Sequence, residues 1–130
     1  IMALGKIKAD TLEHSTAGTV DTQYVVGGSA KGWVNFDGSA GTISARGSLN
    51  VSGFTDHASG EYTITLSSAF DSTNNMAPVG SNGNTVTDPA NSFTSCVAVN
   101  TTSTRHEIYS GSNSKGDRNF VYVIQHGDLA

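Results

Sequence analysis

Cysteine, proline and charged residues are all scarce in this sequence. Of 130 residues, one is Cys, two are Pro and 14% are Asp, Glu, Lys or Arg. A single cysteine excludes an intrachain disulfide, and we expect Cys96, in an apolar run, to act as a small buried hydrophobic residue. The formal net charge of −4 is small compared with that of typical disordered chains. The sequence therefore predicts a folded domain that is held together by packing, either alone or together with oligomerisation.

Basic clusters and long hydrophobic runs are also missing. The seven Lys and Arg residues are scattered from Lys6 to Arg118, whereas binding to a phosphate backbone needs clustered basic side chains. No apolar run approaches the roughly 20 residues of a membrane-spanning helix. We therefore expect neither a nucleic-acid partner nor insertion into a membrane.

Ser, Thr, Gly and Asn are plentiful, and these residues favour turns over helices. Many of the apolar residues are Val, Ile, Tyr and Phe at two-residue spacing, which is typical of strands. Short strands flanked by turn residues predict an all-β fold, an antiparallel β-sandwich of about seven or eight strands. A chain of 130 residues is long enough for one core of this kind.

The clearest strand pattern begins at Gly32. Gly32–Phe36 has Trp33 on one face and apolar residues on the other, and we expect Trp33 to fill the core rather than to form an exposed platform for a sugar. Residues 42–51 alternate throughout and predict one half-buried strand, followed by a bulge at Gly53. Glu61–Leu66 also alternates, which predicts a strand with its Tyr, Ile and Leu side chains buried.

Four more strands are predicted after this block. Residues 76–80 predict an edge strand, because Pro78 cannot donate to a ladder from the interior of a sheet. Asn82 and Gly83 predict a turn. Residues 92–99, 105–109 and 119–125 complete the set, and the last is apolar on both faces, so we expect it at the centre of a sheet.

The first 28 residues differ from the rest because they hold too few apolar residues to bury themselves. Residues 23–26 predict a short strand, and the segment around Leu12 could form a helical turn. We expect residues 1–28 to be an extended arm that packs on the body or on a neighbouring subunit. Residues 29–130 would then form the β-sandwich domain.

No catalytic or metal-binding constellation is evident. The sequence has no Gly-x-Ser-x-Gly elbow, and its four histidines are isolated, although a threefold axis could bring three copies of one histidine together. A pair of carboxylates meeting in a cleft would indicate a glycoside hydrolase; the candidates are Asp37, Asp56, Glu61 and Glu107, of which the two Glu residues are expected to face outward. We therefore expect no enzyme, no catalytic residues, no metal and no cofactor.

Three motifs carry a resemblance to a known family. Residues 30–38 are AKGWVNFDG, residues 50–56 are NVSGFTD and residues 60–66 are GEYTITL. They resemble the A-K-A-W-V-N-F-N-G, N-V-S-S-I-T-D and G-x-Y-T-V-x-F segments of a module in tail-fibre-like and other virion proteins of tailed bacteriophages, particularly marine and cyanobacterial ones. Departures from the pattern are Gly32 in place of Ala and the lack of an aromatic residue near Asn75.

This resemblance implies a non-enzymatic virion structural protein on the surface of the phage particle, synthesised in the host cytoplasm. The leading role is a tail fibre or tail-tip component that contacts the host cell surface. The alternative is a capsid decoration or head-fibre protein stapled to the shell by its arm. The implied partners are other virion proteins, further copies in a homotrimer, and a glycan or protein of the host surface.

Two sets of residues are candidates for these contacts. The arm would provide virion-anchoring or subunit contacts, and exposed polar loops would contact the receptor, because Asn- and Ser-rich loops suit wet, adaptable interfaces. The arm candidates are Ile7, Leu12, Tyr24 and Val25. The loop candidates are Asn74, Asn75, Asn82, Asn84, Asn113, Lys115 and Arg118.

Overall fold

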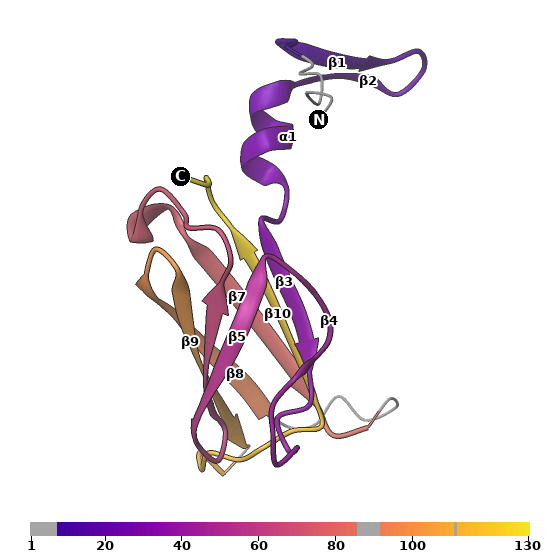
Figure 1. Cartoon of the computed structure of the whole chain (residues 1–130). Coiled ribbons are helices and arrows are strands. Elements are labelled where there is room, and N and C mark those ends of the chain that lie inside the picture. Colours follow the sequence, from indigo (N-terminus) through magenta and orange to yellow (C-terminus); the bar gives the residue numbers. More distant parts are fainter. Residues whose placement is uncertain (1–7, 86–91, 111) are drawn as a thin grey trace.

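The computed structural model describes residues 8–85, 92–110 and 112–130, and in them the chain forms a β-sandwich with a small arm at one end (Figure 1). The arm consists of the hairpin β1 (Thr11–His14) and β2 (Gly18–Asp21) and the helix α1 (Thr22–Gly28). The body contains the 3₁₀ helix η1 (Thr73–Asn75) and eight strands. The strands are β3 (Gly32–Phe36), β4 (Ala45–Leu49), β5 (Val51–Ala58), β6 (Glu61–Leu66), β7 (Ala77–Gly83), β8 (Ser92–Asn100), β9 (Ser103–Ser110) and β10 (Phe120–His126).

The eight strands form two antiparallel sheets. One has the order β4-β3-β10-β7 and the other β5-β6-β9-β8. The predicted antiparallel sandwich with an N-terminal arm is therefore confirmed. The last strand, β10, lies between β3 and β7, as expected for a strand with apolar residues on both faces, and β7 is the edge strand that Pro78 indicated.

The sandwich has two distinct ends. The chain enters β3 directly from the arm, so the arm end holds the start of β3, the segment around η1 and the C-terminus (Figure 1). Hydrogen bonds join these segments, from the Asp71 amide to the Asp128 carbonyl (2.9 Å) and from the Ala130 amide to the Ala69 carbonyl (3.0 Å). The opposite end, here called the far end, carries the turns around residues 37–44, 59–60 and 112–119.

Alternating residues from both sheets form the core. Phe36 makes an edge-to-face contact with Tyr62, with ring centroids 5.3 Å apart, and both side chains are fully buried. The predicted burial of the three apolar β6 side chains is confirmed. The buried hydrophobic residues are Val34, Phe36, Tyr62, Ile64, Leu66, Phe70, Met76, Ile108, Val121 and Val123.

The prediction of one strand over residues 42–51 is wrong. Asn50 adopts a left-handed backbone with φ of 58°, a conformation that Asn tolerates better than most residues. The chain there leaves β4 in one sheet and enters β5 in the other. The bulge at Gly53 is confirmed, because the β5–β6 register shifts between Val51 and Gly53.

Two further predictions of local structure are corrected. Residues 23–26 lie in α1 and not in a strand. The start of this helix is tied to the hairpin, because the Thr22 hydroxyl donates to the Ala9 carbonyl at 2.7 Å and the Thr22 amide donates to the Asp10 carbonyl at 2.8 Å. Asn82 and Gly83 continue β7 rather than forming a turn, since they pair with β10.

The segment around Leu12 is strand β1 rather than a helical turn. Among the described residues, no helix is long and apolar enough to cross a membrane.

Candidate functional site

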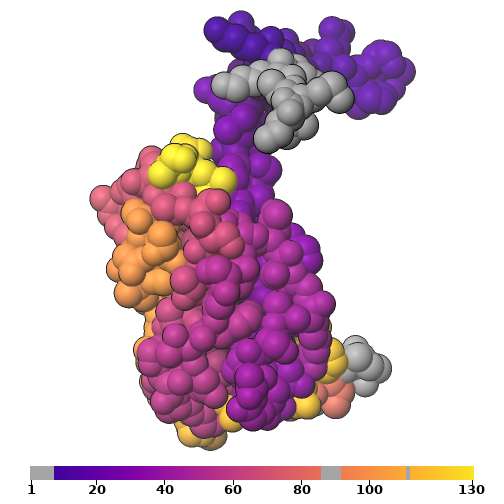
Figure 2. Space-filling model, in the orientation of Figure 1, coloured from indigo at the N-terminus to yellow at the C-terminus, as the bar shows by residue number. Residues whose placement is uncertain are grey.

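The arm exposes its apolar side chains. Leu12, Val25 and Val26 are all exposed, and Tyr24 is 66% exposed. Leu12, Val25 and Val26 also line a shallow groove between the hairpin and α1. Figure 2 shows the arm standing off the body, with α1 as the narrow connection. The arm therefore offers an apolar contact surface that the rest of the described chain leaves exposed.

Lys31 fixes the connection between arm and body. Its ammonium group donates to the carbonyl of Val26, to the carbonyl of Ser29 (3.1 Å) and to the hydroxyl of Ser29 (2.7 Å). The Lys31 amide donates to the carbonyl of Gln125 at 2.9 Å, which joins the same residue to β10. These bonds hold α1 as an extension of β3.

A row of large apolar side chains crosses the outer face of the β4-β3-β10-β7 sheet. Trp33 pairs with Leu49 on one side and Ile124 on the other, and Ile124 pairs with Val79. All four are exposed, Trp33 at 41% and Val79 at 61%. In the next row Tyr122 is also exposed. We call these five residues the apolar face.

Trp33 is thus not a core residue, and the expectation that it fills the core is wrong. Val34 and Phe36 occupy the inner face of β3, so alternation along the strand turns Trp33 outward. Its ring lies over the backbone of β4, where a Cβ on Gly47 would come within 3.3 Å of it.

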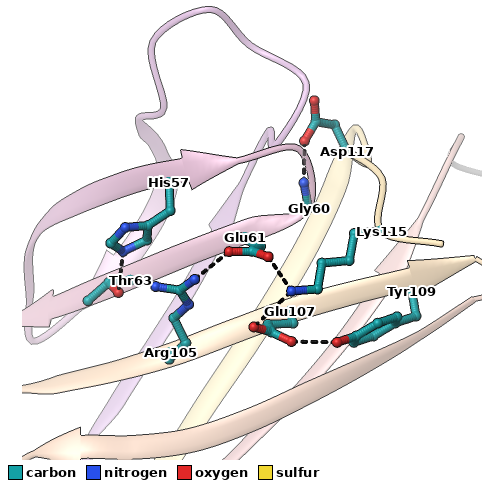
Figure 3. Close-up of polar contacts among 9 residues, drawn as sticks. All are labelled: His57, Gly60, Glu61, Thr63, Arg105, Glu107, Tyr109, Lys115 and Asp117. Carbon is teal, nitrogen blue, oxygen red and sulfur yellow. Dashed lines mark hydrogen bonds and ion pairs between the residues drawn. The ribbon is translucent and has the colours of Figure 1, made fainter. Parts of the chain in front are cut away.

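The outer face of the other sheet carries a network of ion pairs. Figure 3 shows Lys115 between Glu61 and Glu107, with Arg105 on the other oxygen of Glu61 and the Tyr109 hydroxyl on Glu107. The Tyr109 hydroxyl donates at 2.6 Å, and Lys115 lies 3.1 Å from Glu107 Oε1. We call these five residues the charged face.

The charged face ends in an aromatic pair at the sheet edge. Phe93 and Tyr109 are cross-strand partners whose rings stack at 5.0 Å with an interplanar angle of 11°. The Lys115 ammonium lies 5.6 Å from the Tyr109 ring centroid. A cation–π contact is favourable at this distance.

Glu61 and Glu107 are two of the carboxylates that sequence analysis named as a potential hydrolase pair, and they face each other directly across β6 and β9. They lie on a sheet face and not in a cleft. The hydrogen bond from Lys115 lowers the pKa of Glu61, and those from Tyr109 and Lys115 lower the pKa of Glu107. A glycosidase acid needs the opposite shift. Asp37 is not part of this pair, and its Oδ2 lies 2.8 Å from Nη2 of Arg46.

A polar chain crosses the interior between the sheets, and its members are buried except Cys96, which was expected to be buried but is only partly so. Gln125 Nε2 donates to Thr104 Oγ1 at 2.7 Å, Thr104 Oγ1 lies 2.8 Å from His106 Nε2, and His106 Nδ1 lies 3.1 Å from the Cys96 sulfur. Burial lowers the pKa of His106 to about 4 and raises that of the Cys96 thiol to about 11. Both side chains are therefore neutral near pH 7, and Cys96 lacks the thiolate that a nucleophile needs.

The four histidines remain separate. His14 lies in the arm hairpin, His57 on β5, His106 in the core and His126 at the end of β10. Within the described part of the chain, no group of three or more His, Cys, Asp or Glu side chains is placed to hold a metal ion.

The predicted loop residues lie at both ends of the body. Asn74 and Asn75 belong to η1 at the arm end. Asn82 is partly buried on β7, where its amide donates to the Thr94 hydroxyl at 2.8 Å. Asn84 is exposed beyond β7 at the far end.

The remaining predicted contact residues are at the far end or in the arm. Asn113 has a left-handed backbone with φ of 63°, Lys115 belongs to the charged face, and Arg118 is partly buried. Of the predicted arm residues, Leu12, Tyr24 and Val25 are exposed, and Ile7 lies outside the described residues.

Sequence reasoning missed the apolar face and the charged face. The signal for the first was available, because buried Val34 and Phe36 turn Trp33 outward. The charged face depends on the register between strands far apart in the sequence, which no local pattern reveals.

Comparison with known proteins finds no match among protein-family models, curated proteins or solved structures. The function of the chain therefore has to be inferred from its own surfaces.

Proposed function

We propose that this chain is a non-enzymatic structural protein of a tailed-bacteriophage particle, a tail-fibre or tail-tip component that contacts the host cell surface. In this role the arm holds the chain in the particle, through contacts with other virion proteins and with further copies in a homotrimer. The far end of the body then points outward.

The observation that carries this proposal is the separation of two kinds of surface. The arm at one end exposes apolar side chains such as Tyr24 and Val26, which are costly to leave in water and are typical of a protein contact site. The opposite end presents polar residues, among them Asn84, Asn113 and Lys115. Polar loops of this kind suit wet contacts with glycans or proteins.

A capsid decoration protein is the second candidate. Its support is that the described residues form one sandwich joined directly to one arm, with no shaft between the two. Such a body could be stapled to a shell by the arm alone.

Labelling the protein in intact particles, with an antibody imaged by electron microscopy, distinguishes the two roles. Label on the tail is expected, and label on the capsid shell would replace the fibre role with the decoration role. Absence of the protein from purified particles would overturn both.

A variant test connects the arm to incorporation. Val26→Asp places a charge on the exposed arm and should reduce the amount of protein in particles at unchanged expression. Val97→Asp is the matched control, because Val97 is similarly exposed (57% against 61% for Val26) but lies on β8 in the body.

A further inference from the structure

We infer that the apolar face of one chain is covered by the arm of a second copy of the same chain. The inference rests on the proposed role of the arm as a subunit contact, but not on where the chain sits in a particle. It assigns a partner to both of the uncovered apolar surfaces described above.

The first argument is that neither surface is covered by the residues that the structure describes. Five large apolar side chains form the apolar face, and Trp33, Ile124 and Val79 stand in a continuous cross-strand row. A contiguous patch of this kind marks an interaction site, whereas scattered apolar residues do not. At the arm end the face borders a shallow groove of mixed lining, made of Ala30, Leu49 and Leu129 beside the polar residues Lys31, Asn50, Ser67 and Ser68.

The second argument is the area of the face. Four strands about 4.8 Å apart and two rows of side chains make a footprint on the order of 250 Å². A stable interface buries about 800 Å² of each partner. Two apolar faces pressed together would therefore be too small for a stable dimer. In a closed exchange every chain contributes both a face and an arm, so the area buried per chain is about twice this footprint.

The third argument is that the arm fits this footprint. The seven residues of α1 span about 10 Å and form a cylinder about 10 Å wide. The four-residue strands of the hairpin span about 13 Å and lie across the end of α1 (Figure 1). Neither the helix nor the hairpin is longer than the face is wide, roughly 19 Å at the usual strand spacing, and a helix on an open sheet face forms an ordinary third layer.

Charge agrees with this pairing. Thr22–Gly28 contains no charged residue. The two rows that make up the apolar face are also uncharged, because their other members are Gly47, Asn35 and Ser81. Contact between α1 and these two rows would therefore bury no hydrated charge, so the desolvation cost of burying ions does not arise for the helix.

The arm of the same chain is held away from its own face. Only Ser29, Ala30 and Lys31 separate α1 from β3. The Lys31 bonds to Val26, Ser29 and Gln125 keep the helix in line with the strand. Folding the arm back over Trp33 would break them, whereas an arm from another copy reaches the face without this loss.

A contact between two different surfaces repeats from copy to copy, and it gives a closed ring where the rotation closes and an open filament where it does not. We infer the closed form. Reciprocal exchange of two arms gives a dimer, and cyclic exchange of three gives a trimer. In either case the mass is a multiple of the 13.4 kDa chain, and every Trp33 is covered.

The experiment uses the full chain and its single tryptophan. Analytical ultracentrifugation should give a dimer or trimer, with Trp33 emission shifted to shorter wavelength and protected from acrylamide. Val25→Asp in the arm and Ile124→Asp in the face should each give a monomer with Trp33 readily quenched. Val97→Asp, on the exposed outer face of β8, should leave both mass and quenching unchanged.

Mixing the two monomeric variants tests whether the arm comes from another copy. Val25→Asp keeps an intact face and Ile124→Asp keeps an intact arm, so an equimolar mixture should form a complex that neither variant forms alone. This complex has one arm–face contact and should be weaker than the wild-type oligomer. A wild-type chain that stays monomeric at its highest soluble concentration overturns the inference. If Trp33 is nevertheless protected in that monomer, the chain's own arm covers the face.

Two other results would also overturn it. An oligomer that tolerates Ile124→Asp but not Val25→Asp would place the arm on another surface. An oligomer that tolerates Val25→Asp but not Ile124→Asp would mean that the faces pair without the arm. Labelling of the capsid shell, by contrast, would change the proposed fibre role and leave this inference intact.

Discussion

The hydroxyl group of Tyr62 lies 2.6 Å from Oδ1 of Asp117, inside the far end of the sandwich. The same hydroxyl is 2.8 Å from the carbonyl oxygen of Gly38, and Asp117 Oδ1 also accepts the Gly60 amide at 2.7 Å. One phenol thereby joins the three turns of the far end. Burial, together with the hydrogen bond to Asp117, raises the pKa of Tyr62 above its usual value, so the hydroxyl remains a donor.

Tyr62→Phe should lower the free energy of unfolding by about 1–3 kcal/mol, because the buried acceptors lose their donor. Urea denaturation measures this directly. Tyr24→Phe is the matched control, since Tyr24 is 66% exposed. Removal of its hydroxyl group should change the free energy of unfolding by less than about 0.5 kcal/mol. Equal stability of the Tyr62 variant and wild type would contradict a structural role for the hydroxyl.

Acid should destabilise the protein through His106. Burial lowers its pKa from 6.5 to about 4, so the unfolded chain binds a proton more readily than the folded chain. The neutral His106 side chain therefore contributes fully to the free energy of unfolding above about pH 6.5. As the pH falls to 4, this free energy should decrease by about 3 kcal/mol. Denaturation curves at several pH values measure this loss.

His106→Gln isolates the effect of this histidine from that of the carboxylates. The variant should be less stable than wild type at pH 7, but its stability should fall less between pH 7 and pH 4. His57→Gln, on the exposed part of β5, should retain the full wild-type loss. A wild-type slope in the His106 variant would contradict the assignment.

Lys115 should control the ionisation of the charged face. Lys115→Met removes the hydrogen bonds that lower the pKa of Glu61 and Glu107, so both pKa values should rise. An NMR titration of the side-chain carboxyl carbons reports the two residues separately. Lys8→Met, in the arm, should change neither pKa. An unchanged pKa of Glu61 in the Lys115 variant would refute the network.

Gly127 should not tolerate a side chain. Its φ is 141°, and a Cβ there would lie 2.2 Å from the Asn75 carbonyl oxygen and 2.8 Å from the Phe70 ring. The backbone conformation alone should cost Gly127→Ala about 1–3 kcal/mol, before the contacts are counted. A Cβ on Gly41 would meet no atom within 4 Å, so Gly41→Ala should leave the stability nearly unchanged. Thermal melts of the two variants and of wild type measure the difference.

Much of the fold follows from alternation along single strands. Alternation in Glu61–Leu66 buries its Tyr, Ile and Leu side chains, and alternation in Gly32–Phe36 buries Val34 and Phe36. The same rule failed over residues 42–51, because Leu49 and Val51 continue the alternation across Asn50 although the chain changes sheets there. A two-residue period in the sequence does not reveal where the backbone adopts the left-handed conformation.

The arm and the charged face could not be read from local pattern. Tyr24, Val25 and Val26 have high strand propensity, yet they form a helix whose start is tied to the hairpin by Thr22. Glu61 meets Lys115 and Arg105 only because β6, β9 and the far-end turn come together. Contacts between such distant segments are set by the register of the sheet.

The position of β3 determines how the body responds to force. The arm leads into β3 through only three residues, and β3 has a hydrogen-bonded neighbour on each side, β4 and β10. A pull on the arm against the far end is therefore directed along a central strand. Because ladder hydrogen bonds run perpendicular to the strands, both ladders are loaded in shear at once instead of opening one bond at a time. Attachment through β3 thus makes the body a strong anchor under tension, whereas an edge strand would be held on one side only.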